Sequence, residues 1–193
     1  MEDTFPKNIA TSIKDERFLN FFFRRVQPVD TKLQHDVMEP RQIPVQDYPF
    51  VSPCGKELNF IRPAALPFVF HGLVEESSAT MDKQQQSAHL VYGGTLRQAF
   101  AWNLLAVSPI TGRIYHARQG EGRDEVPAIP YGLVRSQLAV SLVEQMQVME
   151  QDDDDDQEEI LAYRDDDGNL HPVQWLPAEA EPGAWAMPWE YEQ

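Results

Sequence analysis

The charge of this chain is segregated along its length, and this limits which part of it can form a folded core. Residues 1–143 contain 15 Lys and Arg and 15 Asp and Glu, whereas residues 144–193 contain a single base and 16 acids. The net charge of −15 therefore belongs to the last fifty residues. A run of like charges, such as the five aspartates at 152–156, is usually solvated or disordered. The alternative is a contact for a basic partner, with the acids steering the encounter.

The composition excludes several classes of protein. Of the 193 residues, 42% are apolar, and the 10 Phe, 6 Tyr and 4 Trp are enough for a packed core, which argues against full disorder. No stretch approaches the ~18 consecutive apolar residues of a membrane span. The single cysteine, Cys54, excludes an internal disulfide framework and a multi-cysteine metal cluster. A strongly acidic chain is a poor general binder of nucleic acid, so we expect no direct nucleic-acid binding.

An N-terminal helix is predicted within residues 7–26. Asp15 suits the N-cap position, and Pro28 stops the helix. Apolar side chains recur at helical spacing on one face, and we expect the core to cover that face. These side chains are Phe18, Leu19, Phe22 and Val26.

A second and longer helix is predicted near residues 131–149, after Pro130. Its apolar positions are spaced i, i+4, i+8, i+12 and i+15, which is typical of one face of an amphipathic helix. They are Val134, Leu138, Leu142, Met146 and Met149.

The residues between the two helices are predicted to form mainly β structure. Residues 27–47 are polar and contain three prolines, so we expect a loop there. Strands at 48–51 and 58–61 flank the Ser-Pro-Cys-Gly-Lys-Glu turn, a hairpin pattern. Further strands are expected at 66–74, 89–92, 96–107 and 113–116, the last two joined by a turn at 108–112.

The order of elements is typical of the α+β class. We expect one α+β domain over residues 1–149, with curved antiparallel sheets of hairpins, an N-terminal helix and the helix near 131–149 packed against them. An acidic linker follows over residues 150–159. Residues 160–176 are predicted to form a C-terminal hairpin around an Asp-Gly turn and to pack on the domain. A Pro- and Trp-rich tail occupies residues 177–193.

Few residues form a recognisable catalytic pattern. Cys54 and His116 are a candidate nucleophile and base, but a reactive thiol needs a nearby cation or helix N-terminus, and a tight turn explains Cys54 equally well. Neither a Gly-x-Ser-x-Gly elbow nor a phosphate-binding glycine loop occurs. The five histidines stand singly, and Asp165-x-Asp167-x-Asn169 lacks the Gly and Glu of a calcium loop. We therefore expect no metal and no cofactor.

Two groups of residues are candidates for binding. Arg135 begins the apolar segment of the second predicted helix, where an arginine can hold a carboxylate or phosphate in bidentate fashion, or instead pair with a carboxylate of the domain. Trp185, Trp189 and Tyr191 are candidate anchors for a protein partner, because large aromatic side chains often fill the centre of an interface.

Motifs of the neutral part resemble an uncharacterised eukaryotic family, uncharacterised protein family zero-five-nine-eight, whose human member is encoded by an open reading frame on chromosome eight. The most specific is Ser52-Pro53-Cys54-Gly55 followed by Asn59-Phe60-Ile61-Arg62. The resemblance covers residues 7–143. Further matching motifs are Lys7-Asn8-Ile9, Pro67-Phe68-Val69-Phe70, Tyr92-Gly93-Gly94, Gly112-Arg113-Ile114-Tyr115-His116 and Gly132-Leu133-Val134-Arg135-Ser136.

The resemblance implies a mitochondrial location and no known activity. Glu2 and Asp3 give no support to an import signal in this chain, since transit peptides avoid acids. Members of the family carry an aromatic-rich strand pair ahead of Lys7. Its absence here would leave an open sheet edge, and the alternative explanation is a truncated gene model. More faintly, the order of elements is similar to a bacterial α+β family of unknown function.

We therefore expect a non-catalytic accessory or interaction protein of the mitochondrion, with one or more protein partners in a larger assembly. The alternative is an enzyme or a binder of a small anionic ligand. In that case Cys54, Arg62, His116 and Arg135 converge on one pocket, with Cys54 as the nucleophile and the two arginines holding the anion.

Overall fold

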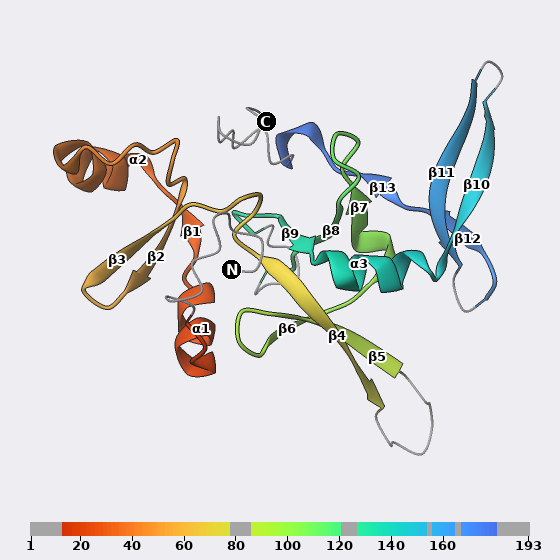
Figure 1. Ribbon diagram of the computed structural model, residues 1–193, viewed down its shortest axis with the longest axis horizontal. Helices are drawn as coiled ribbons and strands as arrows, with labels where there is room; N and C mark the ends of the chain where they lie inside the picture. The colour runs from red at the N-terminus through yellow and green to blue at the C-terminus, as the bar shows by residue number, and fades with distance from the viewer. Residues whose placement is uncertain (1–12, 78–85, 121–126, 154–155, 165–166, 181–193) are drawn as a thin grey trace.

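The computed structural model describes residues 13–77, 86–120, 127–153, 156–164 and 167–180, and over these the chain has an α+β fold. Its strands form one seven-stranded sheet and two three-stranded sheets. In Figure 1 the seven-stranded sheet lies in the middle of the molecule. Strands β2 (Phe50–Cys54) and β3 (Glu57–Ile61) lie at one end, and strands β10 (Met146–Asp153) and β11 (Asp156–Arg164) lie at the other. The expected α+β class is confirmed, whereas the curvature of the sheets stays a prediction.

The N-terminal helix and the hairpin after it form as predicted. Helix α1 spans Glu16–Phe23, and the side chain of its N-cap, Asp15, accepts a 2.8 Å hydrogen bond from the Phe18 amide. Such a cap satisfies one of the free amides of the first turn. The three-stranded N-terminal sheet has the order β1-β2-β3, all antiparallel, with bounds Gln27–Pro28, Phe50–Cys54 and Glu57–Ile61.

The segment expected as a loop over residues 27–47 contains three short helical turns. They are α2 (Thr31–Leu33), the π-helix Gln34–Met38 and the 3₁₀ helix Glu39–Arg41. Met38 is fully buried there, which gives this polar segment an apolar attachment.

The seven-stranded sheet has the order β13-β7-β8-β9-β4-β5-β6 and is antiparallel except for the β13/β7 and β4/β9 pairs. Of the hairpin predicted from strands at 96–107 and 113–116, the parts at 105–107 and 114–117 pair, with Leu105 opposite His116. The strands are β4 Val69–Ser77, β5 Gln86–Tyr92, β6 Leu96–Ala99, β7 Leu105–Val107, β8 Ile114–Ala117, β9 Tyr131–Val134 and β13 Gln174–Trp175, and the 3₁₀ helix Trp102–Leu104 precedes β7.

The prediction of a long helix near residues 131–149 is wrong, because only the middle of this range is helical. Helix α3 spans Ser136–Val143, while Tyr131–Val134 is strand β9 and Met146 begins strand β10. Strand β9 pairs with β4 and β8, which lie far away in the sequence. These long-range hydrogen bonds outweigh a local apolar spacing that also suits a helix.

The acidic segment expected as a linker is part of a hairpin instead. Strand β10 (Met146–Asp153) and strand β11 (Asp156–Arg164) pair antiparallel, and β12 (Leu170–Pro172) completes the third sheet. Strands β11 and β12 pair antiparallel on either side of the Asp-Gly turn, in the region where a C-terminal hairpin was predicted. The chain then returns to the seven-stranded sheet through β13.

The buried core lies on both faces of the seven-stranded sheet. One cluster contains Phe70, Leu90 and Leu142, and a second contains Leu66, Leu133 and Ala180. Ala180 belongs to a last 3₁₀ turn, Ala178–Ala180, and residues 181–193 of the predicted tail lie outside the described residues. Within the described chain we find no helix with the length and apolar character needed to cross a membrane.

Candidate functional site: an apolar cavity beside the N-terminal helix

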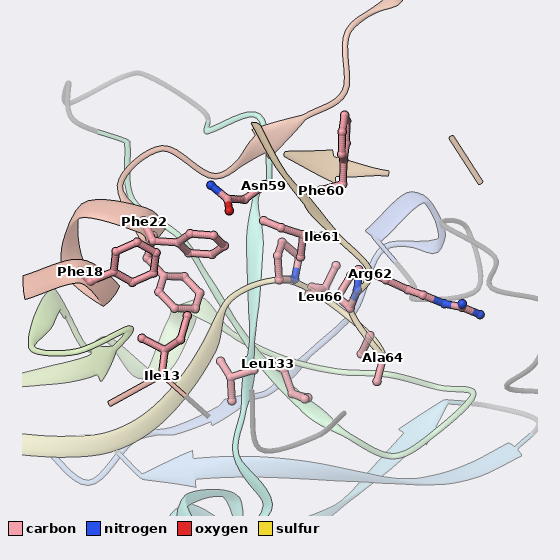
Figure 2. A pocket seen from close by; sticks show the side chains of 15 residues that line it. Ile13, Phe18, Phe22, Asn59, Phe60, Ile61, Arg62, Ala64, Leu66 and Leu133 are labelled. Atoms are coloured by element: carbon pink, nitrogen blue, oxygen red, sulfur yellow. The ribbon is translucent and has the colours of Figure 1, made fainter. Parts of the chain in front are cut away.

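A cavity of about 330 Å³ lies between helix α1, the end of strand β3 and the segment that connects β3 to β4. We call it the phenylalanine cavity. Figure 2 shows Phe18 and Phe22 on one side of it and Ile61, Leu66 and Leu133 facing them. Its lining is Ile13, Phe18, Phe22, Phe23, Asn59, Phe60, Ile61, Arg62, Pro63, Ala64, Ala65, Leu66, Pro67, Val69 and Leu133.

Helix α1 is held in place by a turn of the seven-stranded sheet. The Asn20 side chain donates from Nδ2 to Thr95 Oγ1 and accepts from the Thr95 amide, both at 2.8 Å. The helix approaches so closely that a Cβ on Gly94 would lie 2.7 Å from the Glu16 carbonyl oxygen. The helix backbone therefore lies against a glycine, and Phe18 and Phe22 of this helix line the cavity.

The opposite wall is the segment from Arg62 to Pro67, which leaves strand β3 with two prolines and two alanines. Ala65 and Leu66 are buried, and Ala64 is half-buried, so the small side chains leave the space that the cavity occupies. Arg62 is exposed, and in Figure 2 its side chain extends away from the phenylalanines. Among the lining residues it is the one with a charged side chain, so the cavity is apolar with a basic group at its rim.

A second cavity, of about 430 Å³, lies beside helix α3 and strands β8 and β9. It is lined in part by Ile114, Leu133 and Ala139, and by Val140 and Val143, which are 60% and 42% exposed. It is therefore a depression next to an exposed helix face, and it lacks the aromatic lining of the first cavity.

His116 is enclosed in the main core and its ring nitrogens are hydrogen-bonded. The Ala101 amide donates to Nε2 at 3.2 Å, so the proton of the neutral ring is on Nδ1, which donates to the Ala117 carbonyl at 2.7 Å. The ring lies between Phe70 and Phe100, at centroid distances of 5.9 and 5.6 Å. Burial lowers the pKa of His116 from 6.5 to about 4, and the hydrogen bond to the Ala117 carbonyl opposes only part of this shift. His116 is therefore a neutral core residue at physiological pH.

Cys54 and Arg135 lie apart from His116 and line neither of the two cavities. Cys54 ends strand β2 and is half-buried, with Sγ 3.6 Å from Ser52 Oγ, and this hydroxyl donates to the Phe22 carbonyl at 2.8 Å. Arg135 is the N-cap residue of helix α3, and its amide donates to the Phe70 carbonyl at 2.9 Å. Of the four residues proposed to converge, Arg62 lines the phenylalanine cavity, and the other three line neither of the two cavities.

Arg118 is a half-buried cation that the sequence patterns did not single out. Its guanidinium carbon lies 3.5 Å from the centroid of the Phe68 ring, and Nη1 donates to the Ile129 carbonyl at 3.0 Å. Burial lowers its pKa, and a hydrogen bond with Tyr92 opposes this. The sequence signal that could have pointed to Arg118 is a lone arginine directly after a strand. Arg118 lines neither cavity, and its hydrogen bond to Ile129 stabilises the segment before strand β9.

The remaining candidates lie elsewhere. Trp185, Trp189 and Tyr191 fall outside the described residues. Within the part of the chain that the structure describes, no three His, Cys, Asp or Glu side chains gather in a position to hold a metal ion.

The fold and the cavity define an α+β protein with an aromatic-lined apolar cavity at the edge of its N-terminal sheet. A family model described as a domain of unknown function, DUF4505, matches residues 1–174. The chain belongs to the DUF4505 family. It is also similar to the crystal structure of a DUF1285 family protein from Silicibacter pomeroyi DSS-3, with a TM-score of 0.43 and 13% identity over 85% of this chain and 72% of that chain. A likeness of this degree supports no statement about function.

Proposed function

We propose that the protein is a non-catalytic interaction protein, and that the phenylalanine cavity receives an apolar side chain of a protein partner. The observation that carries the proposal is the lining: four phenylalanines and several aliphatic and proline side chains surround about 330 Å³. Small-molecule sites usually measure about 300–1,000 Å³, so this cavity is at the small end and suits one or two large side chains. Buried aromatic and aliphatic anchors in such pockets dominate many interfaces.

The mitochondrial part of the proposal rests on the resemblance of residues 7–143 to the eukaryotic family described above. In this setting the protein is an accessory member of a larger assembly rather than an enzyme. Fractionation of cells that express the tagged protein tests the location. Recovery of the tagged protein in the cytosol alone, when it is expressed from the complete coding region, would contradict the mitochondrial location.

The cavity is tested by cross-linking from its rim. Phe60 lines the cavity and is half-buried, so a photoreactive benzoylphenylalanine placed there lies within reach of a bound partner. We expect a defined cross-linked product in isolated mitochondria that disappears when Ala64→Phe fills the space. The matched control is Ala139→Phe, which adds the same ring to the second cavity and leaves the product unchanged. A product insensitive to Ala64→Phe would contradict the proposal.

One observation favours the alternative, a binder of a small anionic ligand: Arg62 lies at the rim of an apolar cavity. A ligand with an apolar body and a carboxylate would place its anionic end there. The catalytic version, with Cys54 as nucleophile, is tested by Cys54→Ser. Loss of a measured turnover or of ligand binding would favour it over the interaction protein, and an unchanged phenotype would favour the latter.

A further inference from the structure

We propose that the C-terminal aromatic segment of this chain, residues 181–193, occupies the phenylalanine cavity when no partner is bound. This inference rests on the proposed function, since it adds a competitor for the same site. The segment contains Trp185, Trp189 and Tyr191, the residues first considered as partner anchors.

The end of the described chain lies next to the cavity. Ala180 is buried in the same apolar cluster as Ala65, Leu66 and Leu133, and these three residues line the phenylalanine cavity. The chain is brought there by strand β13, which pairs with β7, and by a 2.7 Å hydrogen bond from the Leu176 amide to the Val107 carbonyl. Ala180, the last residue that the structure describes, therefore belongs to the same apolar cluster as part of the cavity wall.

The length of the segment suffices. Trp185 is five residues beyond Ala180, and a chain spans at most about 3.3–3.6 Å per residue, so it reaches up to about 17 Å from that point. Trp189 reaches further by four residues. Because one end is already fixed, the cost of bringing the segment to the cavity is that of closing a short loop, which grows slowly with its length.

The chemistry of the segment matches that of the cavity. Its middle part, Ala-Trp-Ala-Met-Pro-Trp at 184–189, is apolar, and it is flanked by three glutamates with no Lys or Arg in residues 181–193. The cavity has an apolar aromatic lining, and Arg62 is the charged residue at its rim. An indole placed among Phe18, Phe22 and Leu66 buries its ring against aromatic and aliphatic side chains, while glutamates remain near a guanidinium.

The consequence is a competition between the segment and a partner. A tethered segment has a high effective concentration at its own cavity, so a partner must outcompete it, and binding then frees Trp185 and Trp189. The same aromatic anchors are thereby covered in the free protein and become available in the bound state.

The test uses the purified full-length protein labelled with 5-fluorotryptophan, whose ¹⁹F signals are assigned by single Trp→Phe variants. We expect the signal of Trp185 or Trp189 to be shifted from that of the free amino acid and to be protected from a soluble nitroxide. Ala64→Phe removes the shift and the protection, whereas Ala139→Phe, beside the second cavity, leaves both unchanged. Signals of Trp185 and Trp189 that are unprotected in the unsubstituted protein, or that ignore Ala64→Phe, would overturn the inference.

Cross-linking of the same purified protein identifies the occupant. With benzoylphenylalanine at position 60, mass spectrometry should find an intramolecular link to residues 181–193, lost in Ala64→Phe. A link to residues 1–12, or to a second copy of the chain, would overturn the inference. Since this experiment contains no partner, its failure is separate from failure of the proposed function, which would appear as an absent or cavity-independent product in mitochondria.

Discussion

The surroundings of His116 and the phenylalanine cavity are both lined by aromatic rings, yet they are packed in opposite ways. His116 is fully buried, lies between Phe70 and Phe100, and hydrogen-bonds to the Ala101 and Ala117 backbone. The cavity leaves about 330 Å³ between Phe18, Phe22 and the segment after Arg62. His116, a residue type that often takes part in catalysis, is therefore a packed core residue in this protein. The candidate binding site is instead the apolar space that the side chains leave unfilled.

The largest expected effect is from His116→Ala. The substitution removes a buried ring and leaves the Ala101 amide without its acceptor, so the free energy of unfolding should fall by about 3–5 kcal/mol. Urea denaturation followed by circular dichroism measures it. Phe18→Ala, a half-buried ring that already borders empty space, should cost clearly less. Equal losses at the two positions would break the comparison.

The pH dependence of stability follows from the same burial. The unfolded chain protonates His116 near its ordinary pKa of 6.5, whereas the folded protein does so only near about 4. The unfolded state therefore binds more protons between these values. The contribution of the neutral His116 to the free energy of unfolding is complete above pH 6.5 and is lost as the pH falls to about 4. It amounts to about 3 kcal/mol.

The check on this pH dependence is the difference in unfolding free energy between the wild type and His116→Asn across that window. The slope of the variant should be smaller. Parallel curves would show that His116 is not kept neutral by burial.

A smaller loss is expected from Gly132→Ala. A Cβ there would lie 2.6 Å from a ring carbon of Phe70, which is itself buried, and overpacking of this kind costs about 1–3 kcal/mol. Gly72→Ala is the matched control, because its Cβ would meet Val91 at an ordinary 3.8 Å. Thermal unfolding of the two variants compares them. A stable Gly132→Ala protein would mean that the region around Phe70 has room to adjust.

The smallest effect concerns the helix that forms the wall of the cavity. Asn20→Ala removes both hydrogen bonds to Thr95, and we expect a loss of about 1 kcal/mol together with faster amide exchange in α1. Asn20→Asp keeps an acceptor for the Thr95 amide and hydroxyl and should restore most of the stability. If both variants behave like the wild type, α1 is held by its apolar face alone.

Local signals were sufficient for some elements and misleading for others. The N-cap at Asp15 and the hairpin around residues 54–57 depend on neighbouring residues, and both were predictable. Met146 has a spacing that suits a helix, but it pairs with Tyr163 in a sheet, and that partner is distant in the sequence. The acidic run was read from its charge alone, whereas most of it is paired in β10 and β11.

The candidate site could be predicted only in part. The face of Phe18 and Phe22 was recognised as needing a cover, and Arg62 was named as a ligand-binding candidate. The cavity itself arises because α1, β3 and the segment before β4 meet without filling the space between them. Unfilled space between three segments has no signature in the sequence of any one of them. For this reason the sequence led to His116 as a candidate catalytic base and did not predict the cavity.

The most direct test of the cavity as a binding site is a titration of the full-length protein, carrying Trp185→Ala and Trp189→Ala, with indole as the probe. Methyl NMR signals report where the indole binds. We expect saturable shifts at Ile61 and Leu66, which line the cavity, none at Leu90 and Leu105 in the closed core, and loss of the shifts in Ala64→Phe. Absent shifts at Ile61 and Leu66, or shifts that persist in Ala64→Phe, would contradict the claim.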